Sequence, residues 1–224
     1  MMSSLIKIIT TAAYRIMFFI RNRRVLVAIG VSDRKTVRKI IGIFGEIDRK
    51  ISLFCAVSGT KCPPNCGECC LNPGVEAMVT ELLPLAVHLW SNGTAIAALE
   101  KLETRGFRGP CVFYNATSPD GANGRCSVYP LRPSICRLFG FSASTDKEGK
   151  TVFASCYKMK ALYPEDHKRA LSLVDKGLKV PHINDFSVRI AGLVPGSGAW
   201  QYPINEAARI AIEKVGLAIR LGRK

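Results

Sequence analysis

The chain of 224 residues contains 32 Lys and Arg, 17 Asp and Glu and nine cysteines, and its formal net charge is +15. A chain of this length can bury a core of its own, so cross-links need not hold the whole fold together. The odd cysteine count and the lack of a recognisable secretory signal argue against a disulfide framework. The basic residues form no compact tract of the nucleic-acid-binding type.

The N-terminal segment, residues 5–20, repeats apolar residues at helical spacing and contains no acidic residue. The repeat consists of Leu5, Ile9, Ala12, Ile16 and Phe19. It predicts an amphipathic helix, and because Lys7 and Arg15 interrupt it, the segment is too short between charges to span a membrane. Two interpretations stay open: a helix packed on the core, or a helix at a membrane interface or in a transit segment.

More helices are predicted further along the chain. Ser32 and Asp33 can cap one that runs to about Phe54, and the residues Ser58-Gly59-Thr60 break the chain after it. Others are predicted from Thr80 to Trp90, from Thr94 to Arg105 with Gly106 after its end, from Pro164 to about Lys176, and from Asn205 to Leu221.

The segment 107–157 has a different character, because short runs of β-branched and aromatic residues alternate with turn signals. It predicts short strands, while Pro130 and Pro133 stiffen the backbone before Cys136 and residues 192–203 form an irregular linker. The fold class is therefore α+β and mainly helical, with an irregular cysteine-rich lobe between flanking helices. The expected divisions are N-terminal helices at 1–54, a cysteine domain at 55–160 and a helical extension at 161–224.

Four cysteines crowd into nine residues, at Cys62, Cys66, Cys69 and Cys70. Adjacent cysteines can form a disulfide only with strain, whereas metal ligation has no such pairing constraint. Pro63, Pro64 and Gly67 exclude regular helix from this stretch. Four more cysteines follow at Cys111, Cys126, Cys136 and Cys156, and Cys55 is left over. Eight thiols suit two four-sulfur sites, or one cluster and a second site, with a disulfide framework as the alternative.

Thiolates bind zinc, iron and iron–sulfur clusters, and the spacing does not choose among them. The Cys-x₃-Cys-x₂-Cys spacing of residues 62–69 also partly resembles the [4Fe–4S] motif of radical enzymes that use S-adenosylmethionine. Such a site is negatively charged, so nearby cations can offset its charge. Arg125, Arg132 and Arg137 flank the downstream cysteines and are predicted to do this, with nucleic-acid contact or a solvated surface as alternatives.

Hydrolysis and nucleotide binding find no support in the sequence. There is no Gly-x-Ser-x-Gly motif, and the glycine-rich run 192–198 lacks the Gly-Lys-Ser/Thr ending of a phosphate loop. His88 is predicted to pack within its apolar helix. His167 and His182 are expected at the surface, outside any ligand set.

Three motifs in order resemble the YkgJ-like cysteine-cluster family, the CxxCxxCC group of zinc- or iron-chelating domains. They are Cys62-x₃-Cys66-x₂-Cys69-Cys70, Gly124-Arg125-Cys126-Ser127-Val128-Tyr129 and Arg132-Pro133-x₂-Cys136-Arg137. The resemblance covers roughly residues 55–160, with one extra residue between the first two cysteines. It implies a chelating module with the ligands Cys62, Cys66, Cys69, Cys70, Cys126 and Cys136, to which the spacing adds Cys111 and Cys156.

The leading hypothesis is a metal-binding protein that holds zinc or an iron–sulfur cluster, such as [4Fe–4S], through up to eight thiolates. One branch of the family looks like flagellin lysine N-methylase, so an Fe–S-dependent methyltransferase or redox enzyme is an alternative. A third is a zinc-stabilised basic adaptor that binds nucleic acid or an anionic membrane surface through its basic termini. Reduced thiols indicate the cytoplasm, with residues 5–20 as a peripheral membrane contact.

Overall fold

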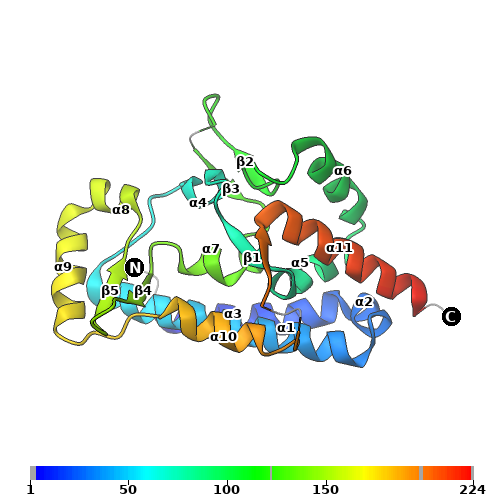
Figure 1. The fold of residues 1–224 in the computed structure, drawn as a ribbon, viewed down its shortest axis with the longest axis horizontal. Helices are drawn as coiled ribbons and strands as arrows, with labels where there is room; N and C mark the ends of the chain where they lie inside the picture. The colour runs from blue at the N-terminus through cyan, green and yellow to red at the C-terminus, as the bar shows by residue number, and fades with distance from the viewer. Residues whose placement is uncertain (1–3, 122, 197–198, 223–224) are drawn as a thin grey trace.

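The computed structural model describes residues 4–121, 123–196 and 199–222, and is mainly helical with short antiparallel strand pairs, as predicted (Figure 1). The helices are α1 (Ser4–Arg21), α2 (Arg23–Ala28), α3 (Gly30–Ser58), α4 (Glu68–Leu71), α5 (Val79–Ser91), α6 (Ala95–Arg105), the 3₁₀ helix η1 (Tyr129–Leu131), α7 (Ser134–Leu138), α8 (Tyr157–Leu162), α9 (Pro164–Asp175), α10 (Ile183–Ala191) and α11 (Ile204–Leu221). The strands are β1 (Glu76–Met78), β2 (Tyr114–Ala116), β3 (Gly124–Cys126), β4 (Ser142–Thr145), β5 (Thr151–Ala154) and β6 (Gln201–Pro203).

The long helices agree with the periodic patterns of the sequence. α3 begins two residues before the predicted Ser32 cap, with no side-chain capping bond, and ends at Gly59, whose φ of 77° is the left-handed conformation of a helix stop. α6 ends at Gly106, as predicted. In the part of the chain that the structure describes, no helix has both the length and the apolar character needed to cross a bilayer.

The short elements differ from the predictions. Residues 68–71 are helical in spite of the nearby prolines and glycine, and Ser134–Leu138 forms a helix that was not predicted. α8 and α10 were also not predicted. Helices this short are marginal alone and depend on tertiary contacts, which leave no periodic signal in the sequence. The predicted linker contains β6, which pairs with β1.

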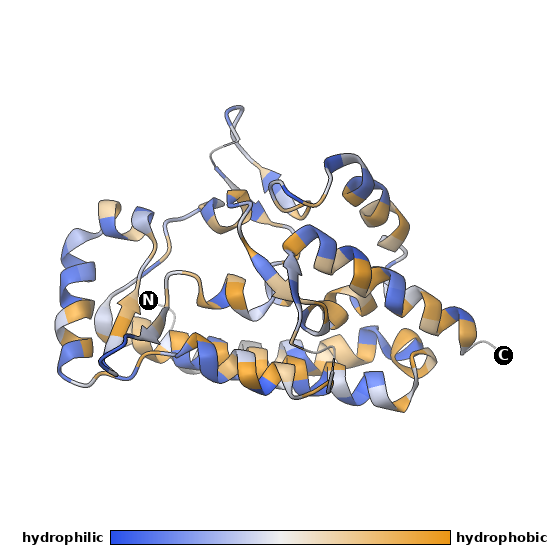
Figure 2. Ribbon diagram, viewed as in Figure 1, coloured by the Kyte–Doolittle hydropathy of each residue, from blue (hydrophilic) through white to orange (hydrophobic). Residues whose placement is uncertain are grey.

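Helices α5 and α11 form the centre of the molecule, and Trp90 donates from Nε1 to the carbonyl of Ile212 at 2.8 Å. The pairing of β1 with β6 sets them side by side, because each strand runs directly into one of the two helices. Ile40, Ile47 and Leu82 are fully buried in the same core, at roughly 1.5–3 kcal/mol each. In Figure 2 the helices around α5 carry many hydrophobic residues, whereas α9 is largely hydrophilic.

A smaller hydrophobic cluster lies at the C-terminal end of α3. Phe54 of α3 packs against Phe153 of β5, with ring centroids 5.1 Å apart, and α9 adds Ala170 and Val174. This cluster attaches the β4–β5 hairpin and α9 to the main body, at the left of Figure 1.

An ion pair joins α3 to α10, and its contribution to stability should depend on pH. Glu46 accepts hydrogen bonds from both terminal nitrogens of Arg189, at 3.1 and 2.8 Å, and these bonds, assisted by Lys50, lower the pKa of Glu46 to about 2. A lowered pKa means that the stabilisation is present above the unfolded-state pKa and is lost as the pH falls toward the folded-state value.

Replacement Glu46→Gln should therefore lower the free energy of unfolding near neutral pH by up to about 1 kcal/mol, the range for partly exposed pairs. Urea unfolding of both proteins over a pH series measures this. The difference should shrink below about pH 4. A difference that stays constant down to about pH 2 would contradict the assignment.

Candidate metal centre

Seven of the nine cysteines line one cavity of about 280 Å³, although they come from four separate segments of the chain. They are Cys62, Cys66, Cys69, Cys70, Cys111, Cys126 and Cys136. No disulfide joins any of the nine cysteines. Cys156 lies directly before α8 and outside the cavity lining, but its charge acts on Cys62. Cys55 lies on α3, where its sulfur accepts a hydrogen bond from the Thr60 hydroxyl at 3.6 Å.

The loop that carries Cys62 and Cys66 is fixed against β3. Asn65 has a φ of 52°, a left-handed conformation that asparagine tolerates better than most residues, and it turns the chain just before Cys66. The amide of Gly124 donates to the Asn65 carbonyl at 3.0 Å, and Cys66 forms a β-bridge with Asn123. This pairing places the first motif beside Cys126 at the end of β3.

The ring of Tyr114 lies between two glycines of the cysteine motifs. A Cβ atom on Gly67 would lie 2.0 Å from the ring, and one on Gly124 would lie 2.5 Å from the ring and 2.4 Å from the backbone oxygen of Asn115. Real Cβ atoms do not come this close, so both positions require glycine. The Tyr114 hydroxyl donates to the Gly121 carbonyl at 2.8 Å, which holds the ring in this slot.

Cys70 and Cys111 are connected through the backbone, because the amide of Cys111 donates to the Cys70 carbonyl at 2.8 Å. The loop around Cys111 is held by Asn205, a fully buried residue at the start of α11. Its Oδ1 accepts from the amide of Val112 at 3.0 Å, and its Nδ2 donates to the carbonyl of Pro110 at 3.2 Å. The C-terminal helix therefore positions one of the candidate ligands.

Cys136 lies on the short helix α7, which two buried charged residues hold in place. Glu81 of α5 accepts from the Ser134 amide at 2.7 Å and from the Ser134 hydroxyl at 2.9 Å, which satisfies the first turn of α7. Arg137 pairs with Asp48 of α3 and also donates to the carbonyls of Arg132 and Pro130. Burial raises the pKa of Glu81, and the bonds from Ser134 oppose this.

The three predicted charge-offsetting arginines occupy different positions. Arg125 and Arg132 line the cavity, whereas Arg137 is 4% exposed, faces Asp48 and stays outside the lining. The guanidinium of Arg132 lies over the ring of Tyr129 at 3.7 Å. Its Nε atom is buried without a hydrogen-bond partner in the described residues, so a negatively charged centre in the cavity would supply the acceptor that it lacks.

The thiols influence one another strongly. The Cys70 thiol donates toward Cys69 and Cys126, so the pKa of Cys69 is lowered to about 7 and that of Cys126 is also lowered, with Arg132 helping in both cases. These contacts raise the pKa of Cys70 itself. Burial raises the pKa of Cys111 to about 12 and raises that of Cys136 as well. A bound cation would be needed to hold all of them as thiolates.

The charge interactions divide the sulfurs into two groups that share Cys69. The inner group consists of Cys69, Cys70, Cys111, Cys126 and Cys136, and the outer group of Cys62, Cys66, Cys69 and Cys156. Over the described residues, no three Cys, His, Asp or Glu side chains already converge at a distance that would hold an ion. The sulfurs therefore line the cavity wall without converging on one point.

The fold and the cavity define a mainly helical protein with a cysteine-lined candidate metal centre. Residues 61–157 match the family CxxCxxCC, described as a "Putative zinc- or iron-chelating domain". The resemblance indicated by the three motifs is confirmed over this stretch, which contains all eight predicted cysteine ligands. No curated protein and no solved structure matches the chain.

The structure also reveals positioning residues that the sequence did not indicate. Glu81, Asn205 and Tyr114 each fix a cysteine-bearing segment, but in the sequence they are only a helix start, a second helix start and a strand residue. The histidines lie outside the cavity lining. His88 bonds to Asn92 at 2.9 Å, and His167 bonds to Ser155 at 3.0 Å.

Proposed function

We propose that this protein binds more than one metal ion, or an iron–sulfur cluster, through the thiolates that line the cavity. The observation that carries the proposal is that seven cysteines from four segments share one cavity. A closed zinc site needs only four thiolates, so the set exceeds the requirement of a single ion. Soft donors of this kind select zinc, copper(I) or iron–sulfur chemistry.

The size of the cavity supports a polynuclear centre. A cavity volume of about 10–15 Å³ is enough to hold one water molecule, and this cavity has a volume of about 280 Å³. Cys69 belongs to both sulfur groups and is suited to bridge two metal positions. Arg125 and Arg132 would offset the negative charge that several thiolates bring. A reducing compartment such as the cytoplasm is proposed, because the thiols must remain free to bind.

The experiment is elemental analysis combined with an optical spectrum of protein purified without oxygen. More than one equivalent of zinc in a colourless protein indicates a zinc–thiolate centre. Iron with matching sulfide and a broad absorbance near 400 nm indicates a cluster. Protein that retains at most a trace of metal, even after incubation with zinc or with iron and sulfide, would refute the proposal.

A further inference from the structure

The outward face of α1 is apolar and is not covered by any described element. Ile16 and Ile20 are 63% and 64% exposed, and Ala13 on the same face is exposed as well. The helix contacts the core through Phe18 on its other side. Ile16 of the predicted apolar stripe is thus in solvent, while the side chains of Leu5, Ile9 and Ala12 lie outside the described residues. Exposed isoleucines one turn apart indicate an interaction surface.

A basic hollow lies beside α1. Val31, Arg34, Lys35 and Arg38 at the start of α3 line a cavity of about 210 Å³. Arg38 connects the hollow to α1, because its guanidinium lies 5.5 Å from the centre of the Phe19 ring. Within the described part of the chain, none of the three cations forms an ion pair with a carboxylate, and the positive lining of the hollow favours a bound anion.

The charge of the whole N-terminal region also favours an anionic partner. Residues 1–45 contain nine Lys and Arg but only one acid, Asp33, whose carboxylate pairs with Lys214 at 3.4 Å. The exposed Arg21, Arg23 and Arg24 lie between the end of α1 and α2. In Figure 1 these helices form the edge of the molecule opposite the β2–β3 hairpin.

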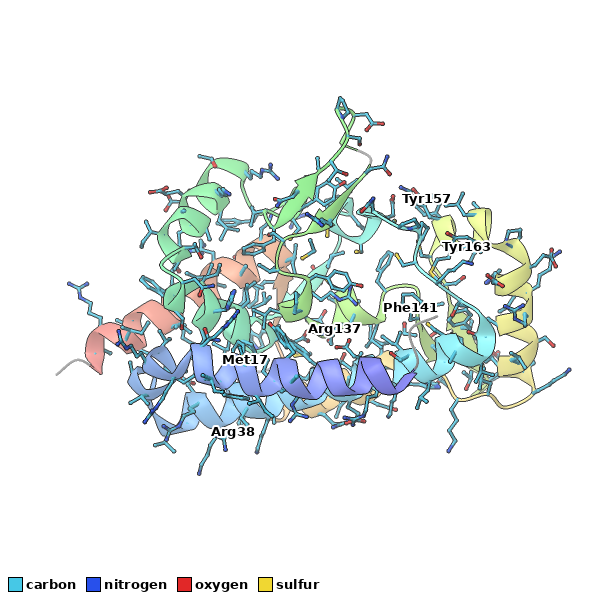
Figure 3. The ribbon with its side chains drawn as sticks, turned by 180° about the vertical axis from the view of Figure 1, so that it is seen from behind. Met17, Arg38, Arg137, Phe141, Tyr157 and Tyr163 are labelled. Atoms are coloured by element: carbon cyan, nitrogen blue, oxygen red, sulfur yellow. The ribbon has the colours of Figure 1, made fainter. Side chains whose placement is uncertain are left out.

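We propose that α1, α2 and the first turns of α3 form a docking surface for an anionic lipid bilayer. Ile16 and Ile20 enter the boundary between headgroups and acyl chains, while Arg34, Lys35 and Arg38 bind lipid phosphates in the hollow. Figure 3 shows α1 crossing the near face with Met17 and Arg38 on opposite sides of it. Exposed aliphatic side chains favour a bilayer over a nucleic acid, because a nucleic acid offers phosphates, base edges and aromatic faces but no apolar interior that could receive isoleucine.

The test is co-sedimentation of the full chain with vesicles of phosphatidylcholine, with and without phosphatidylserine. The protein should bind only the anionic vesicles, and salt should weaken binding. The triple replacement Arg34→Gln, Lys35→Gln, Arg38→Gln should weaken binding by about a hundredfold. The double replacement Ile16→Ser, Ile20→Ser should weaken it by about tenfold or more, and both isoleucines are too exposed for serine to disturb the core.

A matched control removes the same charge elsewhere: Lys101→Gln, Arg105→Gln, Arg108→Gln on and after α6, across the molecule from α1 (Figure 1). This variant should bind anionic vesicles within about twofold of the wild type if the surface is local. Equal loss in both triple variants, or no vesicle binding at all, would overturn the proposal. So would tight binding to single-stranded RNA that is insensitive to the isoleucine replacements, because the occupant would then be a nucleic acid.

Discussion

Replacement of Cys69 by serine is expected to remove most of the bound metal. Cys69 belongs to both the inner and the outer group, because its charge acts on Cys62 and also on Cys111 and Cys136. A serine hydroxyl stays protonated and binds zinc or iron poorly, so both groups lose a ligand at once. Metal content after gel filtration against a weak chelator should fall below one equivalent.

The matched control is Cys55→Ser, which likewise replaces a cysteine sulfur by a hydroxyl oxygen. Cys55 lies on α3 outside the cavity lining, and serine can still accept the hydrogen bond from Thr60. This variant should keep the metal content of the wild type. If Cys69→Ser binds as much metal as Cys55→Ser does, Cys69 is not a ligand and the shared position is wrong. Circular dichroism of each variant separates loss of a ligand from loss of the fold.

Gly124→Ala is expected to give the largest loss of stability, about 3 kcal/mol or more, together with loss of metal. The added Cβ would lie 2.4 Å from the backbone oxygen of Asn115, which cannot move without breaking the pairing of β2 with β3. The same strand carries Cys126, and its first amide holds the turn before Cys66. Denaturant unfolding and metal analysis of the variant measure both effects.

Gly109→Ala serves as the control, since a Cβ there meets only the backbone oxygen of Arg105 at an ordinary 3.9 Å. It should change stability by less than about 1 kcal/mol. A double-mutant cycle adds a sharper test, because the three atoms nearest to a Cβ on Gly67 all belong to the Tyr114 side chain. The cost of Gly67→Ala should therefore largely disappear in a Tyr114→Ala background. Additive costs in that cycle would show that the tyrosine slot does not hold the first motif.

Much of the fold could be predicted where the pattern is long. The stripe of Ile40, Ile47 and their neighbours predicts α3. Gly59 indicates where the helix ends, because glycine adopts the left-handed conformation without steric cost. The cysteine-bearing elements α4, β3 and α7 are much shorter than the roughly 11–18 residues over which such periodicity can be read. α7 has five residues and is stabilised by Glu81, which lies 53 positions earlier in the chain. A contact between residues so far apart in the chain leaves no local pattern in the sequence from which it could be predicted.

The candidate site could be predicted in its ligand types and only partly in its arrangement. The spacing of the cysteines indicated a shared centre, and the structure places seven of them around one cavity. The spacing did not indicate that Arg137 faces Asp48 while Arg132 lines the cavity, because both arginines lie close to Cys136 in the sequence. Which of two nearby cations is aimed inward is decided by packing against α3.

The contribution of the last helix to the cavity wall bears on the order of events during synthesis. Ile204 and Ala208 line the cavity, and Asn205 fixes the loop of Cys111, yet all three leave the ribosome well after Cys156. A nascent chain that already contains every candidate cysteine ligand but not α11 still lacks one wall of the cavity. Insertion of a metal is therefore expected only after α11 has been synthesised and has packed, and a chain stalled before α11 would present reactive sulfurs to oxidants.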